Sequence, residues 1–320
     1  MTTRIIGTGS AVPKKIVTND DLAKIMDTSD EWIRQRTGIA TRNLCVEETT
    51  VSLCYEAAKN ALENAGKQPE EIDLILVATV SPDNVIPCTA CDLQARLGAE
   101  HATAFDLNSA CSGFLFAMAT AHAYLEAGMM KNALIVGGET LSKLMNWEDR
   151  TTSVLFGDGA GAAVLEHSDR GIRSIVQGSN GFKGSVLACR ARNKNNPYVE
   201  KDDSVSYVTM DGHEVYRFAT RQVPKSILEV LEKAGCGVED ISYFLLHQAN
   251  IRILEAVGKR LKIPMEKIPN NLDRHGNMSS ASIPVLLDEM NRQGRLKQGD
   301  KIVLSGFGAG LTYGAILLEW

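Results

Sequence analysis

The stretch Phe105-Asp-Leu-Asn-Ser-Ala-Cys-Ser-Gly-Phe-Leu-Phe-Ala-Met-Ala119 decides how the rest of the chain is organised. Residues 102–107 are predicted to form a short strand, and a helix is predicted from Ser112 onward. Asn108 and Ser109 lie between them, and such side chains cap helix starts because their oxygens accept unpaired backbone N–H groups. The helix is apolar almost all the way round, which is typical of a helix enclosed by protein on every side.

Cys111 lies where the predicted strand passes into this helix. The unpaired N–H groups and the dipole at a helix start favour a thiolate over a thiol, which predicts a fast-reacting nucleophile. The alternative is that Cys111 is a small buried hydrophobic residue, as free cysteines often are. This segment alone leaves the choice open, because a nucleophilic cysteine needs partner groups elsewhere in the chain.

Length and composition narrow the class of protein. The chain has 320 residues, more than one typical domain, and a formal net charge of −5, which argues against a nucleic-acid-binding surface. No signal peptide and no membrane span are expected, so a cytoplasmic protein is predicted. Seven cysteines, an odd number, favour free thiols over a disulfide framework. Cys88 and Cys91 match C-x-x-C, but no second pair exists to complete a zinc site.

Internal similarity predicts two related halves. Residues 61–78 recur at 230–247, an offset of 169, and each copy is a helix end, a glycine and an apolar strand. Residues 157–166 are echoed by 306–319 at an offset of 149, which predicts an insertion of about twenty residues near 139–156. Alternating helices and strands predict two α/β units, residues 1–170 and 171–320, related by a pseudo-twofold axis. Residues 178–206 are predicted to form a surface connection.

The repeat also predicts partners for Cys111. Its helix and the corresponding helix end at Gly128 and Gly294, an offset of 166 that relates Cys111 to Asn277. The end of the first repeated strand, Ala78, corresponds to His247. Taken singly, His247 is more simply a core histidine and Asn277 a helix cap. A Cys, a His and an Asn placed together at the axis form a catalytic constellation.

At these residues the chain resembles the β-ketoacyl-acyl-carrier-protein synthase III family over essentially its whole length. The matching motifs are Asp27-Thr-Ser-Asp-Glu-Trp-Ile33, Arg36-Thr-Gly38, Ala110-Cys-Ser-Gly-Phe114, Phe156-Gly-Asp-Gly-Ala-Gly161, His247-Gln-Ala-Asn250 and His275-Gly-Asn277. The resemblance implies a thiolase-like, five-layered αβαβα fold and a homodimer. It implies an enzyme, an acyltransferase that initiates fatty-acid synthesis, with no metal and no cofactor.

The resemblance also implies the roles of the catalytic residues. Cys111 would take the acyl group from a short acyl-CoA, a substrate rather than a cofactor. His247 and Asn277 would donate hydrogen bonds to the thioester carbonyl of malonyl-acyl-carrier protein and stabilise the enolate formed as carbon dioxide leaves. His247 would act best as a neutral donor. The backbone N–H groups of Cys111 and Ala309 would form the oxyanion hole, and Ala309 would be strained if that site needs a positive φ.

Similarity to the family assigns two further groups of residues. The coenzyme A site would consist of Trp32, Arg36, Arg150, Gly212, Tyr216, Asn250 and Arg252. Without the resemblance, a buried Trp and solvated arginines would be the simpler interpretation. Ile86 would reach across the dimer and wall the acyl pocket of the partner. An acidic carrier protein would need a basic docking patch, for which helical spacing predicts Arg217, Arg252, Lys259 and Arg260.

Two other functions stay open from the sequence. A non-decarboxylating condensing enzyme resembling hydroxymethylglutaryl-CoA synthase would use a carboxylate base, and Asn277 argues against it because an amide is no base. A silent homologue that only binds acyl-CoA or carrier protein is opposed by the intact Cys, His and Asn. Met278, Ser280 and Tyr313 depart from the residues usual in the family and could reshape the pocket. The sequence leaves the primer open.

Overall fold

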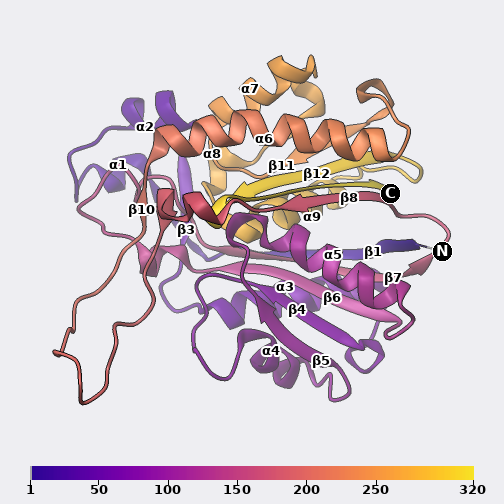
Figure 1. Ribbon diagram of the computed structural model, residues 1–320, viewed down its shortest axis with the longest axis horizontal. Helices are drawn as coiled ribbons and strands as arrows, with labels where there is room; N and C mark the ends of the chain where they lie inside the picture. Colours follow the sequence, from indigo (N-terminus) through magenta and orange to yellow (C-terminus); the bar gives the residue numbers. More distant parts are fainter. Residues whose placement is uncertain (1) are drawn as a thin grey trace.

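The computed structural model describes residues 2–320, and nine of its strands form two sheets (Figure 1). These strands are β1 (Thr2–Ala11), β4 (Leu74–Ala78), β5 (Thr103–Leu107), β6 (Asn132–Glu139), β7 (Gly159–Ser168), β8 (Ile172–Gly178), β11 (Tyr243–Leu246), β12 (Lys301–Gly308) and β13 (Thr312–Glu319). The first sheet has the order β1-β7-β6-β4-β5 and the second the order β11-β12-β13-β8. Two small ribbons pair β2 (Lys15–Thr18) with β3 (Thr41–Leu44) and β9 (Leu187–Ala188) with β10 (Thr209–Met210).

The two sheets repeat one hydrogen-bonding pattern. In the first, β4 runs parallel to β6, and β7 runs antiparallel to both β6 and β1. In the second, β11 runs parallel to β12, and β13 runs antiparallel to both β12 and β8. Only the first sheet carries an additional edge strand, β5, which is parallel to β4.

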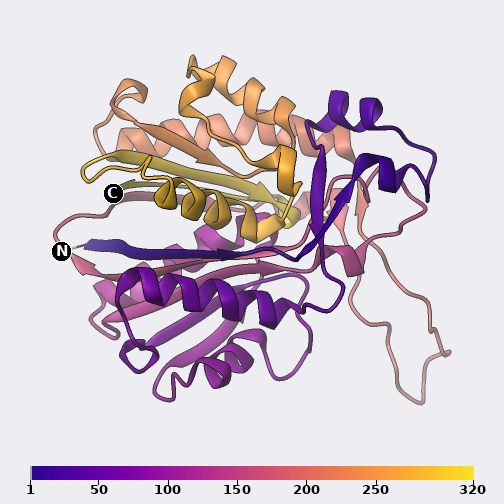
Figure 2. The same cartoon turned by 180° about the vertical axis from the view of Figure 1, so that it is seen from behind.

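Helices and sheets alternate in five layers, which confirms the expected αβαβα architecture (Figures 1 and 2). The helices are α1 (Asn19–Leu22), α2 (Asp30–Thr37), α3 (Thr50–Ala65), α4 (Thr89–Leu97), α5 (Gly113–Glu126), α6 (Gly212–Lys233), α7 (Ile251–Leu261), α8 (Leu272–His275) and α9 (Ser282–Arg292). The outer layers are α3 with α4 on the first sheet and α6 with α7 on the second. Helices α5 and α9 fill the middle layer between the sheets.

The middle layer explains most of the apolar character of α5. Phe114, Leu115 and Met118 of α5 are almost fully buried, and they share one core with residues of α9 and of both sheets. Fully burying a side chain of this size contributes about 1.5–3 kcal/mol. Ala123 is nevertheless exposed, and Phe116 and Thr120 on the same side of α5 are only partly buried. The prediction of a helix enclosed on every side is therefore correct for the sides that face the sheets and wrong for this stripe.

The predicted repeat is present as helix–turn–strand units. Helix α3 leads to β4 and helix α6 leads to β11, and Gly66 and Gly235 after the two helices have φ of +65° and +64°. The insertion is also present: residues 140–158 join β6 to β7, whereas residues 309–311 join β12 to β13. It includes a short 3₁₀ helix, Leu141–Leu144. Within residues 2–320, none of the helices combines the length and the apolar character that crossing a bilayer requires.

The expected surface connection is largely irregular chain. Between β9 and β10 it extends away from the layered body in both views, and most of its residues are exposed (Figures 1 and 2). The strands of the first sheet all precede residue 169, and those of the second all follow residue 171. The chain therefore completes one layered unit before it begins the next.

Candidate active site

Cys111 lies in a 3₁₀ turn, η2 (Ala110–Ser112), between the end of β5 and the start of α5. Ala110 has a φ of +47°, a left-handed conformation that is strained for a residue with a side chain. The end of β12 packs directly on this turn, because a Cβ placed on Gly308 would lie 2.6 Å from the backbone N of Cys111. The turn is thus held against the second half of the chain.

The structure changes the expected protonation state of Cys111. The residue is 9% exposed, and burial raises the pKa of its thiol to about 12. A contact with the Ser279 side chain acts in the opposite direction, while the charge of Glu139 adds to the rise. The expectation of a thiolate stabilised by a helix start is therefore wrong for this state, since α5 begins only at Gly113 and burial dominates. The exposed thiol of the chain is Cys189.

His247 directly follows β11, and its backbone N donates to Ser305 O at 2.9 Å, which extends the strand pairing by one residue. The imidazole is 2% exposed, and its Nδ1 lies 2.7 Å from the Ser282 hydroxyl at the start of α9. The edge of the ring faces Phe307, with 5.4 Å between ring centroids. Burial lowers the pKa of His247 to about 3, so the imidazole is neutral near pH 7.

Asn277 lies in the segment before α9 and is 7% exposed. Its backbone forms a bridge with Phe156, the residue before the Gly157-Asp-Gly segment of the first half. The side-chain Oδ1 accepts a hydrogen bond from the Ser279 N–H at 2.8 Å. Because that contact occupies the carbonyl oxygen, it orients the amide and leaves the NH₂ group to act as a donor.

The elements that carry or adjoin the three residues meet at the starts of the two middle helices. The turn η2 contacts the turn η7 (Ser279–Ala281), the strand β12 beside His247 and the loop Ala309–Leu311. The register used to pair Cys111 with Asn277 is nevertheless wrong by three residues. Helices α5 and α9 begin 169 residues apart, so the position equivalent to Cys111 is Ser280. Helix α5 is three residues longer than α9, which explains the offset of 166 between their ends.

Ala309 does not have a positive φ, so the backbone strain that was expected if its position required one is not present. The left-handed conformations in this loop fall at Gly310, with a φ of +75°, and at Leu311, with a φ of +42°. Of the other departures, Met278 is fully buried beside Val12, and the Tyr313 ring packs edge-on against Phe218. None of these three residues carries a group that could replace a reacting group.

A cluster of aromatic and cationic side chains gathers where α2 meets α7. The guanidinium carbons of Arg36 and Arg150 lie 4.5 and 5.2 Å from the centroid of the Trp32 ring. The Asn250 side chain donates to Arg36 O at 2.9 Å, and Arg252 donates to Gln35 O at 2.6 Å. Gly212 and Tyr216 begin α6 at the same end of the molecule, and Tyr216 is 43% exposed (Figures 1 and 2).

The residues expected to dock a carrier protein differ in their local partners. Arg217 forms an ion pair with Glu214 at 2.6 Å, and Arg260 donates to Thr220 O at 3.3 Å. Lys259 lies in the last turn of α7 and is exposed. Ile86 is 86% exposed on the loop before α4.

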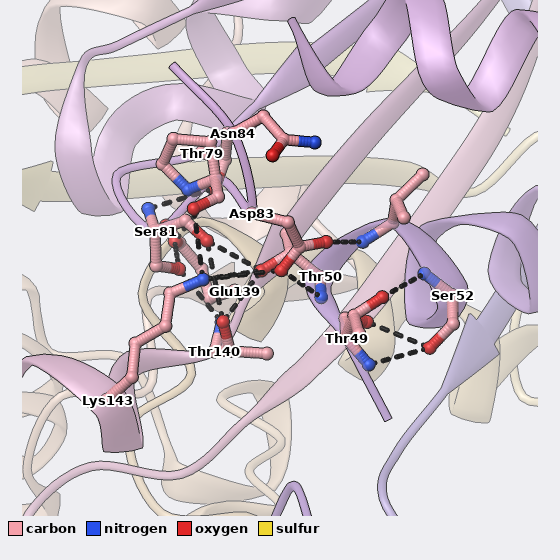
Figure 3. Close-up of polar contacts among 12 residues, drawn as sticks. Thr49, Thr50, Ser52, Thr79, Ser81, Asp83, Asn84, Glu139, Thr140 and Lys143 are labelled. Atoms are coloured by element: carbon pink, nitrogen blue, oxygen red, sulfur yellow. Dashed lines mark hydrogen bonds and ion pairs between the residues drawn. The ribbon is translucent and has the colours of Figure 1, made fainter. Parts of the chain in front are cut away.

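Sequence reasoning missed Glu139, which ends β6 and is completely buried in a network of hydroxyl groups (Figure 3). Its Oε2 accepts from Ser81 Oγ, the Val80 N–H and Thr79 Oγ1, at 2.6, 3.0 and 3.2 Å. Its Oε1 accepts from Ser280 Oγ at 3.0 Å. The sequence does contain a signal for this residue, because Glu139 is a charged residue at the end of an otherwise apolar strand. Ser279 and Ser282, which touch the candidate catalytic groups, were missed as well.

Comparison with known proteins identifies the relatives of this chain. The family described as 3-oxoacyl-[acyl-carrier-protein (ACP)] synthase III matches residues 105–181, and the family for its C-terminal part matches residues 231–320. A β-ketoacyl-[acyl-carrier-protein] synthase III of Clostridium acetobutylicum is 50% identical over 99% of this chain and 98% of the relative. The crystal structure of 3-oxoacyl-[acyl-carrier-protein] synthase III from Aquifex aeolicus is 44% identical, with a TM-score of 0.93 over 99% of this chain and 100% of the other. The priming β-ketosynthase of the R1128 polyketide pathway is 36% identical, with a TM-score of 0.94 over 99% of this chain and 96% of the other.

Proposed function

Because the chain belongs to the β-ketoacyl-acyl-carrier-protein synthase III family, an acyltransferase family of condensing enzymes that initiate fatty-acid synthesis, we propose that Cys111, His247 and Asn277 perform its reaction. The observation that supports this assignment is the contact between the turns before α5 and α9, together with the hydrogen-bond distance between His247 and Ser282 at the start of α9. The alternative reactions are not favoured, since β-ketoacyl-acyl-carrier-protein synthases III match this chain over nearly its whole length at up to 50% identity.

The first half-reaction would store an acyl group on the enzyme. The Cys111 sulfur attacks the thioester carbonyl of a short acyl-CoA, and coenzyme A leaves with the thiol proton. Backbone N–H groups of Cys111 and Ala309 would hold the oxyanion, and the contact between Gly308 and the N of Cys111 supports that pairing.

The second half-reaction would make the carbon–carbon bond. Malonyl-acyl-carrier protein enters, and His247 and Asn277 donate to its thioester carbonyl while carbon dioxide leaves. The resulting carbanion attacks the acyl group on Cys111, and the sulfur departs. A neutral imidazole suits this role, and a hydroxyl proton of Ser282 on Nδ1 would keep the ring proton on Nε2 as a donor.

The cluster around Trp32 supports a coenzyme A site made of Trp32, Arg36, Arg150, Gly212, Tyr216, Asn250 and Arg252. The indole offers a stacking surface for an adenine ring, and the guanidinium groups match phosphate geometry. The stacking of Arg36 and Arg150 over the indole keeps both cations beside that surface. Acyl-CoA binds there as a substrate, and the reaction would need no cofactor.

A homodimer is supported by the edge of the first sheet. Strand β5 is bonded to β4 on one side alone, and its Phe105 and Leu107 are only partly buried. An exposed edge strand is a ready surface for pairing with a second copy. We further propose that the protein acts in the cytoplasm, and that residues 1–170 and 171–320 are its two thiolase-like halves.

The assignment is tested by incubating the protein with a panel of acyl-CoA esters and mapping the acylated residue by intact-mass and peptide analysis. The expected result is one acyl group, on Cys111. Acylation of another residue would contradict the assignment, and the preferred ester would identify the primer.

The same panel tests the place of Ile86. If this exposed side chain walls the acyl pocket of the partner, its moderate size should admit propionyl and branched primers beside acetyl. Ile86→Phe is then expected to narrow the range toward acetyl, because the larger ring shortens the pocket. An unchanged primer profile would reject this role, and Val46→Phe, at another exposed hydrophobic position, serves as the control.

Docking of an acidic carrier protein would rest on Lys259 and Arg252, with Arg217 and Arg260 beside them. Reversing the charge with Lys259→Glu is expected to raise the KM for malonyl-carrier protein several-fold, with a smaller effect on acylation. Raising the salt from about 0.05 to about 0.5 M should weaken the wild type in the same direction, because salt screens exposed charges. Arg252→Glu should act similarly, although it also breaks the contact with Gln35.

Lys131→Glu is the matched control for this experiment. It makes the same charge change at an exposed position after α5, at the opposite end of the molecule from α7's start (Figure 1). If the KM for malonyl-carrier protein changes neither with salt nor in Lys259→Glu, the face of α7 that carries Lys259 has no role in docking.

A further inference from the structure

His275, two residues before Asn277, has no part in the reaction proposed above. It is the last residue of α8 and belongs to the motif His275-Gly-Asn277. Its side chain is only 11% exposed, so protein encloses most of the imidazole ring. A polar ring in such a place needs hydrogen-bond partners, because an unpaired polar group inside a protein costs stability.

Both ring nitrogens of His275 have an acceptor. Nδ1 lies 3.0 Å from Asn43 Oδ1 in β3, and Nε2 lies 3.0 Å from Glu289 Oε1 in α9. Asn43 Nδ2 donates to Pro13 O at 2.8 Å, which turns Oδ1 toward the ring, and a carboxylate only accepts. The ring is therefore the donor in both contacts, and it joins β3 to the middle helix α9.

The acceptor on α9 is itself held in place. Glu289 Oε2 accepts from Arg274 Nη2 at 2.9 Å and from Asn271 Nδ2 at 3.2 Å. Burial acts to raise the pKa of Glu289, but the hydrogen bond from His275 and the charge of Arg274 outweigh it and hold that pKa below its usual range. His275 thus donates to an ionised carboxylate, which makes the stronger kind of hydrogen bond.

The acceptor on β3 links the ring back to Asn277 through a closed chain of contacts. Asn43 O accepts from the Asp158 N–H at 2.8 Å, and the neighbouring Gly157 N–H donates to Asn277 O at 3.0 Å. The packing is close, because a Cβ placed on Gly157 would lie 2.2 Å from His275 O. The His275 ring is therefore the side-chain link that closes this chain of contacts around the backbone of Asn277.

We propose that His275 is a positioning residue, which fixes the Asn277 amide by joining β3 to α9. This role rests on the proposed function for the reaction in which Asn277 takes part. His275 does not act on a substrate, because Asn43 and Glu289 occupy both of its ring nitrogens. Misplacing a reacting group by about 1 Å can cost about 10² in rate, so a loss of this link should slow the step that needs Asn277.

Crystal structures of the wild type and of His275→Gln test the positioning without any substrate. Glutamine has one donor nitrogen in place of two, so it cannot keep both contacts as the ring does. The Asn277 amide should then be displaced by about 1 Å or more, or should adopt more than one orientation. An amide that keeps its wild-type position in the variant, still accepting from the Ser279 N–H at 2.8 Å, would overturn the proposal.

Condensation by pre-acylated enzyme gives a second readout. His275→Gln should lower kcat by a factor on the order of 10 to 10², with little change in the KM for malonyl-carrier protein. Acylation of Cys111 from acetyl-CoA should stay at the wild-type rate, because that step does not use Asn277.

Repeating the substitution in Asn277→Ala protein separates positioning from a general structural role. There His275→Gln should cost less than about twofold in the condensation rate, because the group that it positions is absent. A general structural role predicts the same loss in both backgrounds, and that result would overturn the proposal. Glu289→Gln should show the same dependence on Asn277, and it decides the question if His275→Gln does not fold.

His122→Gln is the matched control. His122 is a partly buried histidine of α5 whose Nδ1 lies 2.8 Å from Thr3 Oγ1, and this variant should change neither the Asn277 amide nor condensation. If the wild type does not condense, or if Asn277→Ala condenses at the wild-type rate, the proposed function is refuted. The crystal structures would still decide whether His275 positions Asn277.

Discussion

Replacing Cys111 with alanine is expected to abolish acylation from acyl-CoA completely while leaving the decarboxylation of malonyl-carrier protein measurable. The sulfur is the one atom that can carry the acyl group, whereas His247 and Asn277 would act on the malonyl thioester from elements other than η2. Intact-mass analysis of the protein and release of carbon dioxide measure the two half-reactions separately.

Cys189→Ala is the control for the loss of a thiol. Cys189 is the exposed cysteine, and it lies at the base of the long surface connection. This variant should be acylated and should condense at the wild-type rate. If Cys111→Ala is still acylated, or if Cys189→Ala is not, the assignment of Cys111 as the nucleophile is wrong.

The second large effect is expected for His247→Ala and Asn277→Ala, which should retain self-acylation and lose decarboxylation. Losing one preorganised donor to a developing oxyanion typically costs about 10²–10³ in rate. The acyl-enzyme is measured by mass and the condensation product by its release on the carrier protein. Near-normal condensation in either variant would contradict the role, and loss of acylation would make His247 the base for the thiol.

The pH dependence of condensation separates a donor from a base. Because burial holds the pKa of His247 near 3, its neutral form persists as the pH falls from about 8 to about 5. The condensation rate of pre-acylated enzyme should therefore show no ionisation near the ordinary histidine pKa of 6.5. A rate that falls with protonation around that pH would mean that His247 titrates in the working enzyme.

Much of the fold follows from patterns that are local in the sequence. The apolar helix after Cys111 and the helix–glycine–strand repeat each predict one element and its burial, and both are present in α5 and in the pairs α3–β4 and α6–β11. The insertion between β6 and β7 was also predictable, because it shifts the repeat offset. These signals depend on periodicity and turn residues, which act over a few neighbours.

The candidate site was less predictable, since it depends on the exact length of helices. Cys111 was paired with Asn277 because the repeat was aligned at the C-terminal ends of the two helices. Helix α5 is three residues longer than α9, so the position in the second half that corresponds to Cys111 is Ser280. The protonation of Cys111 was misjudged for a related reason: a local pattern shows a helix start, whereas the pKa follows from burial between two halves. Glu139 was missed because its donors come from β4's end and from η7, far apart in the chain.

The central claim is that Cys111 carries an acyl group which a decarboxylating condensation then extends, and one chase experiment tests it most directly. Protein acylated from acetyl-CoA is freed of coenzyme A and mixed with malonyl-carrier protein labelled in the free carboxyl carbon. The acetyl group should leave Cys111, the label should be released as carbon dioxide, and the carrier protein should gain the acetyl unit on an unlabelled two-carbon unit. Label retained on the carrier protein, or an acetyl group that leaves Cys111 by hydrolysis alone, would contradict the account.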